Sequence, residues 1–157
     1  MKHRNSLRTL AVLRAIAAGL IIALTHVAPG ADVTATWNST VGNWSDATRW
    51  SSNPNFPNNG GFTFDAVQNG GTLTLDQAIT IEKFTLTSGT QVGGGFNLTL
   101  NDLLTWSAGT LSGAGTIQAD GGITMNVGTK TLSGRTVNNT GAANWTGGAF
   151  DTGQGAV

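Results

Sequence analysis

The chain has 157 residues, with eight Lys or Arg, eight Asp or Glu, and no cysteine. Without a surplus of basic residues it lacks the basic patch that a nucleic-acid-binding protein needs to meet phosphates. Without cysteine it has no disulfides, so its stability must come from packing alone.

Residues 1–31 are predicted to be a secretory signal peptide. Lys2, Arg4 and Arg8 precede an apolar run that is strongest over 15–24, and small residues follow at 28–35, where we expect cleavage. The uninterrupted apolar stretch is shorter than the roughly 20 residues that a membrane-spanning helix needs. We therefore expect an exported chain with no membrane span after leader removal. All eight acidic residues and only four basic ones lie beyond residue 31, so the mature chain would be mildly acidic.

Residues 32–71 are predicted to form an N-terminal cap that ends in a loop rich in Pro, Asn and Gly. Trp37, Trp44 and Trp50 fall here and do not match the repeats that follow. Two interpretations stay open. The indoles either cover the exposed end of a repeat array, since terminal repeats need capping, or form a platform on which sugar rings stack. The sequence favours the cap.

Residues 72–157 repeat themselves. Leu73-Thr74-Leu75-Asp76 returns as Leu98-Thr99-Leu100-Asn101 and as Ile123-Thr124-Met125-Asn126. Alternation of apolar residues with Thr is typical of strands. The constant step of about 25 residues suits one coil of a stacked array. We predict an all-β fold, a right-handed parallel β-helix or β-solenoid whose coils match this step, in which Leu75, Leu100 and Met125 form one inward column.

A family resemblance rests on these same segments. Thr36-Trp37-Asn38, the run from Gly42 to Trp50, Asp65-Ala66-Val67 and the segments 70–76 and 84–89 resemble extracellular bacterial proteins with autotransporter-associated β-strand repeats. The resemblance implies a right-handed parallel β-helix exported to the cell surface or medium. Neither a C-terminal membrane barrel nor a sorting segment follows residue 157, so we expect a chain truncated at its C-terminus.

The residues do not indicate a catalytic, cofactor or metal site. Asp76 and Asp102 lie one predicted repeat plus one residue apart, but the sequence favours two solvated corner residues. A Ser nucleophile would lack a base because both histidines lie in the leader. The calcium-binding nonapeptide of β-rolls is absent. We predict no catalytic residues, no cofactor and no metal ligands.

Outward Thr residues such as Thr72, Thr74 and Thr131 resemble the flat faces of ice-binding proteins. Such a face needs a regular Thr-x-Thr in every coil. At the step predicted from the repeat, the second unit breaks the row, so the sequence argues against this function.

The expected function is that of a secreted or cell-surface structural or adhesive β-solenoid module without enzymatic activity. One alternative is a carbohydrate-binding module that uses Trp37, Trp44 and Trp50. A second is a polysaccharide-degrading β-helix enzyme, which would gather carboxylates and a basic residue in one groove. The expected partners are extracellular polysaccharides or other surface proteins.

Overall fold

The computed structural model describes residues 30–153, so almost all of the predicted signal peptide lies outside the described residues. Apolar residues at every second position make the chain a series of short strands with one buried face each. Between the first two strands and β3 stands one 3₁₀ turn, η1 (Ala47–Arg49). No helix in the described residues is long and apolar enough to cross a membrane.

The strands stack into three parallel layers. The first layer contains β1 (Val33–Thr36), the first halves of β3 (Phe64–Thr74) and β5 (Lys83–Val92), β7 (Leu103–Trp106), β10 (Gly122–Met125) and β13 (Ala143–Trp145). The second contains β2 (Val41–Asn43), the second halves of β3 and β5, β8 (Gly109–Ser112), β11 (Lys130–Ser133) and β14 (Phe150–Thr152). The third contains β4 (Ile79–Ile81), β6 (Leu98–Leu100), β9 (Thr116–Ala119) and β12 (Thr136–Asn139).

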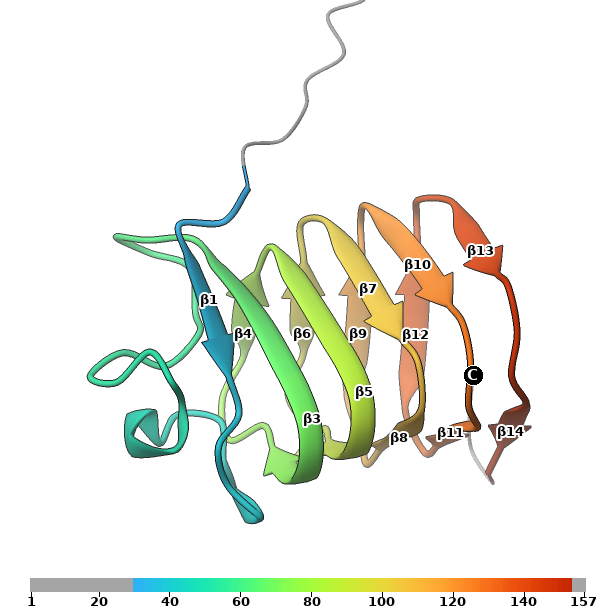
Figure 1. The fold of residues 1–157 in the computed structure, drawn as a ribbon, viewed down its shortest axis with the longest axis horizontal. Coiled ribbons are helices and arrows are strands. Elements are labelled where there is room, and N and C mark those ends of the chain that lie inside the picture. Colours follow the sequence, from blue (N-terminus) through green and yellow to red (C-terminus); the bar gives the residue numbers. More distant parts are fainter. Residues whose placement is uncertain (1–29, 154–157) are drawn as a thin grey trace, which may run out of the picture.

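Successive coils wind around one axis, as Figure 1 shows. The near strands β1, β3, β5, β7, β10 and β13 run downward, the distant strands β4, β6, β9 and β12 run upward, and the chain advances from left to right. The winding is therefore right-handed. The predicted fold class, an all-β parallel solenoid, is confirmed.

The predicted coil length is wrong. Ala66 pairs with Phe84, Phe84 with Leu104, and Leu104 with Ile123. One coil of the first layer is therefore shorter than predicted, at about 20 residues, the lower end of the range for stacked repeats.

The predicted column of matching leucines is wrong as well, because its members lie in different layers. Leu75 follows β3, Leu100 lies in β6, and Met125 lies in β10. Every layer uses the same apolar-Thr-apolar alternation, so the echo in the sequence matched strands of different layers.

Glycines at one corner recur at the observed coil length. Gly89 and Gly109 have φ values of +88° and +91°, in the region that favours glycine. A Cβ atom on Gly109 would lie 2.5 Å from the carbonyl oxygen of Gly89 in the coil below. The corner thus requires glycine for both its backbone angle and its close approach. The corner glycines with left-handed φ are Gly71, Gly89, Gly109, Gly128 and Gly148.

The core is a continuous apolar column inside the coils. Phe84, Leu104 and Leu111 are fully buried, while the Thr residues between inward positions are half-buried on the outside. The solenoid also starts earlier than predicted. β1 already pairs in parallel with β3, which begins at Phe64, so the expected boundary at residue 72 lies inside β3.

Candidate functional site

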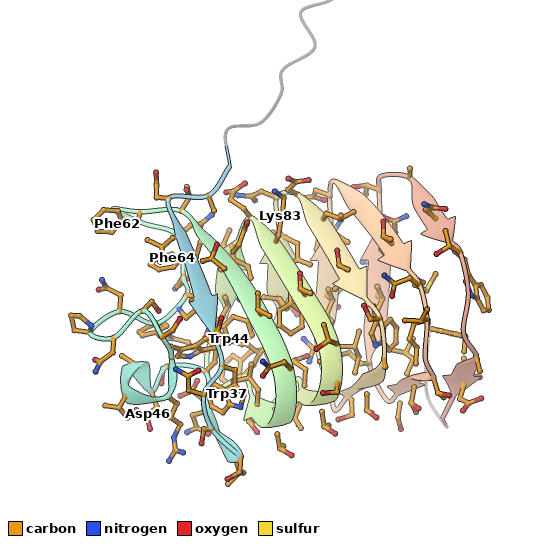
Figure 2. The ribbon with its side chains drawn as sticks, in the orientation of Figure 1. Trp37, Trp44, Asp46, Phe62, Phe64 and Lys83 are labelled. Atoms are coloured by element: carbon orange, nitrogen blue, oxygen red, sulfur yellow. The ribbon has the colours of Figure 1, made fainter. Side chains whose placement is uncertain are left out.

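The three tryptophans of the N-terminal segment are buried, with exposed fractions of 2% for Trp37, 0% for Trp44 and 2% for Trp50. They pack on one another, with ring centroids of Trp37 and Trp50 5.2 Å apart and those of Trp44 and Trp50 5.0 Å apart. Trp44 also contacts Phe84 in the core at 5.7 Å. Figure 2 shows Trp37 and Trp44 within the N-terminal end of the stack.

This packing closes the N-terminal end of the solenoid. The indole nitrogen of Trp44 donates to the carbonyl oxygen of Pro57 at 2.7 Å, and that of Trp50 donates to the carbonyl oxygen of Trp44 at 2.8 Å. The predicted Trp-rich cap is confirmed. The alternative, a sugar-stacking platform on these three residues, is wrong because their faces already contact the core.

The carboxylates do not form the pair considered from the sequence. Asp76 accepts hydrogen bonds from the backbone nitrogen of Ser45 at 3.1 Å and from its hydroxyl at 2.5 Å. Asp102 instead lies 3.4 Å from Nζ of Lys83 on a different face. Asp76 is thus a structural acceptor that ties the N-terminal segment to the first coil.

Lys83 does bridge two carboxylates, since its Nζ also lies 3.9 Å from Oδ2 of Asp65. Burial raises the pKa of Asp65, against the opposing effect of the Lys83 ammonium, and the Asp102 carboxylate raises it further. The side chains of Lys83 and Asp102 are each about a third exposed. The cluster is an ion-pair ladder between coils at the surface, and the two cavities described below are lined by other residues.

A row of threonines runs along the outside of the second layer. Thr72 pairs with Thr90, Thr90 with Thr110, and Thr110 with Thr131, so four consecutive coils place Thr at the same position. Neighbouring strands in a sheet lie about 4.8 Å apart, which makes the row regular. We call these four residues the Thr ladder. A parallel row beside it contains Thr74, Val92, Ser112 and Ser133.

The Thr ladder is uncharged, and its hydroxyls make no hydrogen bond within the described residues. The next position in the row is Asp151 in β14, at the C-terminal end. The sequence argument assumed too long a step, and at the observed step the single row of the Thr ladder is continuous. The requirement of Thr-x-Thr in every coil is still not met, because Val92, Ser112 and Ser133 take the second Thr position in the last three coils.

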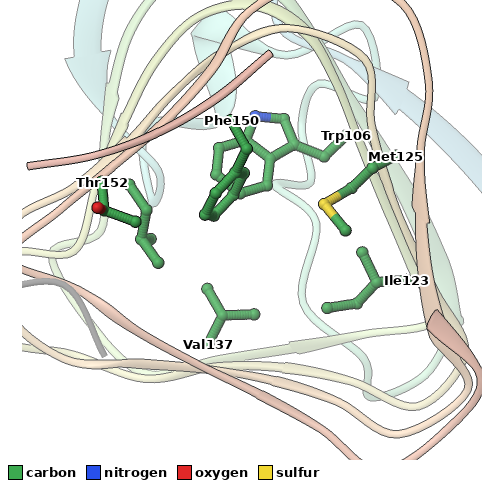
Figure 3. Close-up of a pocket in the computed structure, with 7 residues that line it drawn as sticks. Trp106, Ile123, Met125, Val137, Phe150 and Thr152 are labelled. Atoms are coloured by element: carbon green, nitrogen blue, oxygen red, sulfur yellow. The ribbon is translucent and has the colours of Figure 1, made fainter. Parts of the chain in front are cut away.

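Within the described residues, no further coil covers the C-terminal end of the solenoid. Inside the last coil lies an apolar cavity of about 290 Å³, drawn in Figure 3. Trp106 and Phe150 form its upper wall in an edge-to-face arrangement, with ring centroids 5.6 Å apart. Its lining consists of core side chains that no further coil covers within residues 30–153. The cavity is therefore the exposed end of the core rather than a site with polar groups for chemistry.

Two cations are buried near this end. Nζ of Lys130 lies 2.5–3.4 Å from five backbone carbonyl oxygens, which share its three N–H donors: those of Ser107, Asn126, Val127, Gly128 and Gly147. Arg135 is 1% exposed, and its three guanidinium nitrogens have no partner within the described residues. Burial lowers the pKa of Arg135 to about 10.

The described residues, 30–153, contain no group of three or more His, Cys, Asp or Glu side chains that could hold a metal ion. Comparisons with models of protein families, with curated proteins and with solved structures gave no match. The resemblance to autotransporter-associated repeats stays a prediction.

Proposed function

We propose that this chain is an exported structural or adhesive module, without enzymatic activity, of a bacterial surface or of the surrounding medium. The observation that carries the proposal is the Thr ladder, Thr72, Thr90, Thr110 and Thr131, on a rigid parallel stack. Each hydroxyl is free to bind water or a hydroxylated surface, and each methyl group contributes apolar contact. Repetition of one weak contact at a fixed spacing raises the overall avidity without any strong single site.

The carboxylates accept hydrogen bonds from neighbouring residues of the chain, which supports a non-enzymatic role. Glu82 accepts from the side-chain amides of Asn59 at 2.8 Å and Asn101 at 2.9 Å. Asp46 accepts from Thr48 and Arg49, and these bonds lower its pKa. General acid catalysis requires a carboxyl group with a raised pKa facing a substrate. Asp65, whose pKa is raised, lies against the Lys83 ammonium instead, while Glu82 and Asp46 stabilise coil contacts and a turn.

The export part of the proposal is tested by fractionation. The full chain with a C-terminal tag is expressed in a Gram-negative bacterium, and each fraction is probed for the tag. We expect a product shortened by cleavage between residues 28 and 35, in the medium or at the cell surface. An uncleaved product confined to the cytoplasm would contradict the proposal.

The adhesive part is tested by charging the ladder. Thr110→Lys places an ammonium in the middle of the row, while Thr99→Lys places the same charge on the third layer, in the middle of the column Thr80, Thr99 and Gln118. Beads carrying the Thr110→Lys variant should attach to an uncharged hydroxylated surface such as agarose several-fold less than wild type, and those carrying Thr99→Lys should attach as wild type does. Equal attachment of both variants would show that the Thr ladder is not the adhesive surface.

The continuity of the ladder favours a second candidate function, adsorption to ice. Strands about 4.8 Å apart give one regular row of Thr hydroxyl and methyl groups, and the row about 6.6 Å away along the strands adds the side chains of Thr74, Val92, Ser112 and Ser133. The same variants test it. Wild type and Thr99→Lys should show thermal hysteresis, and Thr110→Lys should not. Absence of hysteresis in wild type would dismiss this candidate and leave the adhesive proposal standing.

A further inference from the structure

A second cavity, of about 260 Å³, lies at the N-terminal end beside the Trp cap. It is formed by the loop between η1 and β3, and its walls include three aromatic side chains and two side-chain amides. They are Phe56, Phe62, Phe64, Asn55 and Asn58. No charged side chain of the described residues lines it. Unlike the cavity at the C-terminal end, it combines flat apolar faces with hydrogen-bonding groups.

The loop is held in place by bonds to the solenoid. Asn59 donates its backbone N–H to the carbonyl oxygen of Thr80 at 2.7 Å, and Oδ1 of Asn58 accepts from the backbone nitrogen of Thr80 at 2.9 Å. The loop thus pairs with the edge of β4 much as a strand would. The bond from Trp44 to the carbonyl oxygen of Pro57 anchors it from below. The cavity is consequently preformed, which lowers the entropic cost of binding.

The aromatic walls differ in exposure. Phe64 is 3% exposed and belongs to the core, and Phe56 packs against the core. Phe62 is 55% exposed, and Figure 2 places it at the outer edge of the loop, beyond Phe64. An exposed aromatic ring at the rim of a cavity offers a flat apolar surface to a ligand. The face of a sugar ring that carries axial C–H groups matches such a surface.

Free amide groups lie beside these rings. The Nδ2 group of Asn58 makes no hydrogen bond within the described residues, and neither does the side chain of Asn55. An amide donates and accepts at once, as vicinal sugar hydroxyls require. The uncharged lining favours a neutral ligand. A cavity of about 260 Å³ is slightly smaller than most ligand pockets, which run from about 300 Å³, so it suits a single ring.

We propose that this cavity binds one ring of a neutral polysaccharide, with the ring stacked on Phe62 and its hydroxyls bonded to Asn55 and Asn58. The proposal deepens the proposed function, because it names the partner of an adhesive module. It rests on that function only for the place, outside the cell, where the protein meets the polysaccharide. It also moves carbohydrate recognition from the buried tryptophans to the neighbouring loop.

The test measures binding of the purified full chain to insoluble cellulose, chitin and curdlan, with soluble oligosaccharides of each as competitors. Phe62→Ala removes the stacking face and should lower the bound fraction at least about tenfold, the usual cost of losing an aromatic anchor. Asn55→Ala removes a free amide and should lower it about three- to tenfold. The matched control is Phe96→Ala, which removes another exposed phenylalanine, 40% exposed, at a distant corner.

The expected result is binding of wild type and Phe96→Ala to at least one neutral polysaccharide, loss of binding in Phe62→Ala, and no binding to alginate. Thermal unfolding of each variant ensures that the folded protein is compared. Failure of wild type to bind any of the three, or equal losses in Phe62→Ala and Phe96→Ala, would overturn the proposal. The purified-chain assay is independent of export. An exported chain that binds no polysaccharide overturns this inference alone, and a cytoplasmic chain that binds one overturns the proposed function alone.

Discussion

At the scale of single residues, the two buried cations near the C-terminal end should affect stability in opposite directions. Lys130 is surrounded by five carbonyl oxygens, whereas Arg135 has no partner for its guanidinium within the described residues. A buried ammonium that satisfies several carbonyl oxygens leaves fewer buried acceptors without a donor, whereas a buried charge without partners costs free energy. Both side chains face the interior, so solvent does little to screen either effect.

Replacing Lys130 by Met should lower the free energy of unfolding by about 1–3 kcal/mol, because buried carbonyl oxygens lose the ammonium that they share as a donor. Lys83→Met is the matched control. Its ammonium forms ion pairs at the surface and its side chain is 38% exposed, so its loss should cost at most about 1 kcal/mol. Urea unfolding followed by tryptophan fluorescence measures both. Equal losses would show that the contacts between Lys130 and the five carbonyl oxygens add nothing to the free energy of unfolding.

Replacing Arg135 by Met should raise the free energy of unfolding at pH 7 by about 1–3 kcal/mol, since it removes an unpaired buried charge. A pKa lowered to about 10, well below its ordinary value, means that the folded state disfavours the charged form. The unfolded chain therefore binds more protons above about pH 10, and wild type gains stability as the pH rises from about 10 toward the ordinary, higher pKa of arginine.

The stability advantage of Arg135→Met should accordingly shrink above pH 10. Denaturant unfolding of both proteins at pH 7, 9, 10.5 and 11.5 measures it, and titration of the lysines cancels in the difference. A destabilised variant at pH 7, or an advantage that does not change with pH, would contradict an unpaired buried guanidinium.

At the scale of elements, the corner between the first and second layers depends on glycine. Gly109→Ala should lower the free energy of unfolding by more than about 2 kcal/mol, because it combines a strained φ with a Cβ that meets the Gly89 carbonyl oxygen at 2.5 Å. Gly95→Ala is the control, since Gly95 has φ +87° but open space around it. It should cost only the strain, about 1 kcal/mol. A loss at Gly109 no larger than at Gly95 would mean that the coils are not in close contact at this corner.

The sequence contained the strands but not their order in space. Alternation of apolar residues with Thr predicted strands such as β4, β6, β7 and β10, since the buried face of a strand needs one apolar residue in two, but not β1 and β2, which lie in the predicted cap. The same alternation hid the coil length, because Leu98-Thr99-Leu100 in the third layer looks like Ile123-Thr124-Met125 in the first. Glycines give a better period. Each corner glycine is held by its own steric requirement, so its spacing follows the coil.

The candidate site was harder to predict from the sequence than the strands were. A cap and a sugar platform use the same three tryptophans, and only burial in the fold separates the two. Phe62 and Asn55 stand in a loop without periodicity, where nothing in the sequence indicates which side chains share a cavity. The Thr ladder became visible only when the register was known.

At the scale of the whole molecule, the two ends of the solenoid are unlike. The Trp cap covers the N-terminal end, while the C-terminal end exposes Trp145, at 55%, and the cavity beside Phe150. In a stacked array each coil is stabilised mainly by its neighbours. The Trp cap and the loop cavity lie together at the N-terminal end. The Thr ladder runs along the second layer of the stack. All of these placements depend on the register of the coils.

Cysteine cross-linking tests this register most directly, because the chain has no cysteine of its own. The double variant Thr90→Cys/Thr110→Cys puts the thiols on paired strands, about 4.8 Å apart at the backbone and within the range of a disulfide. The double variant Thr85→Cys/Thr110→Cys separates them by one step of the apparent sequence repeat, which places them on different layers. We expect the first pair to form an intramolecular disulfide under mild oxidation and the second to stay reduced. Cross-linking of the second pair and not the first would contradict the account.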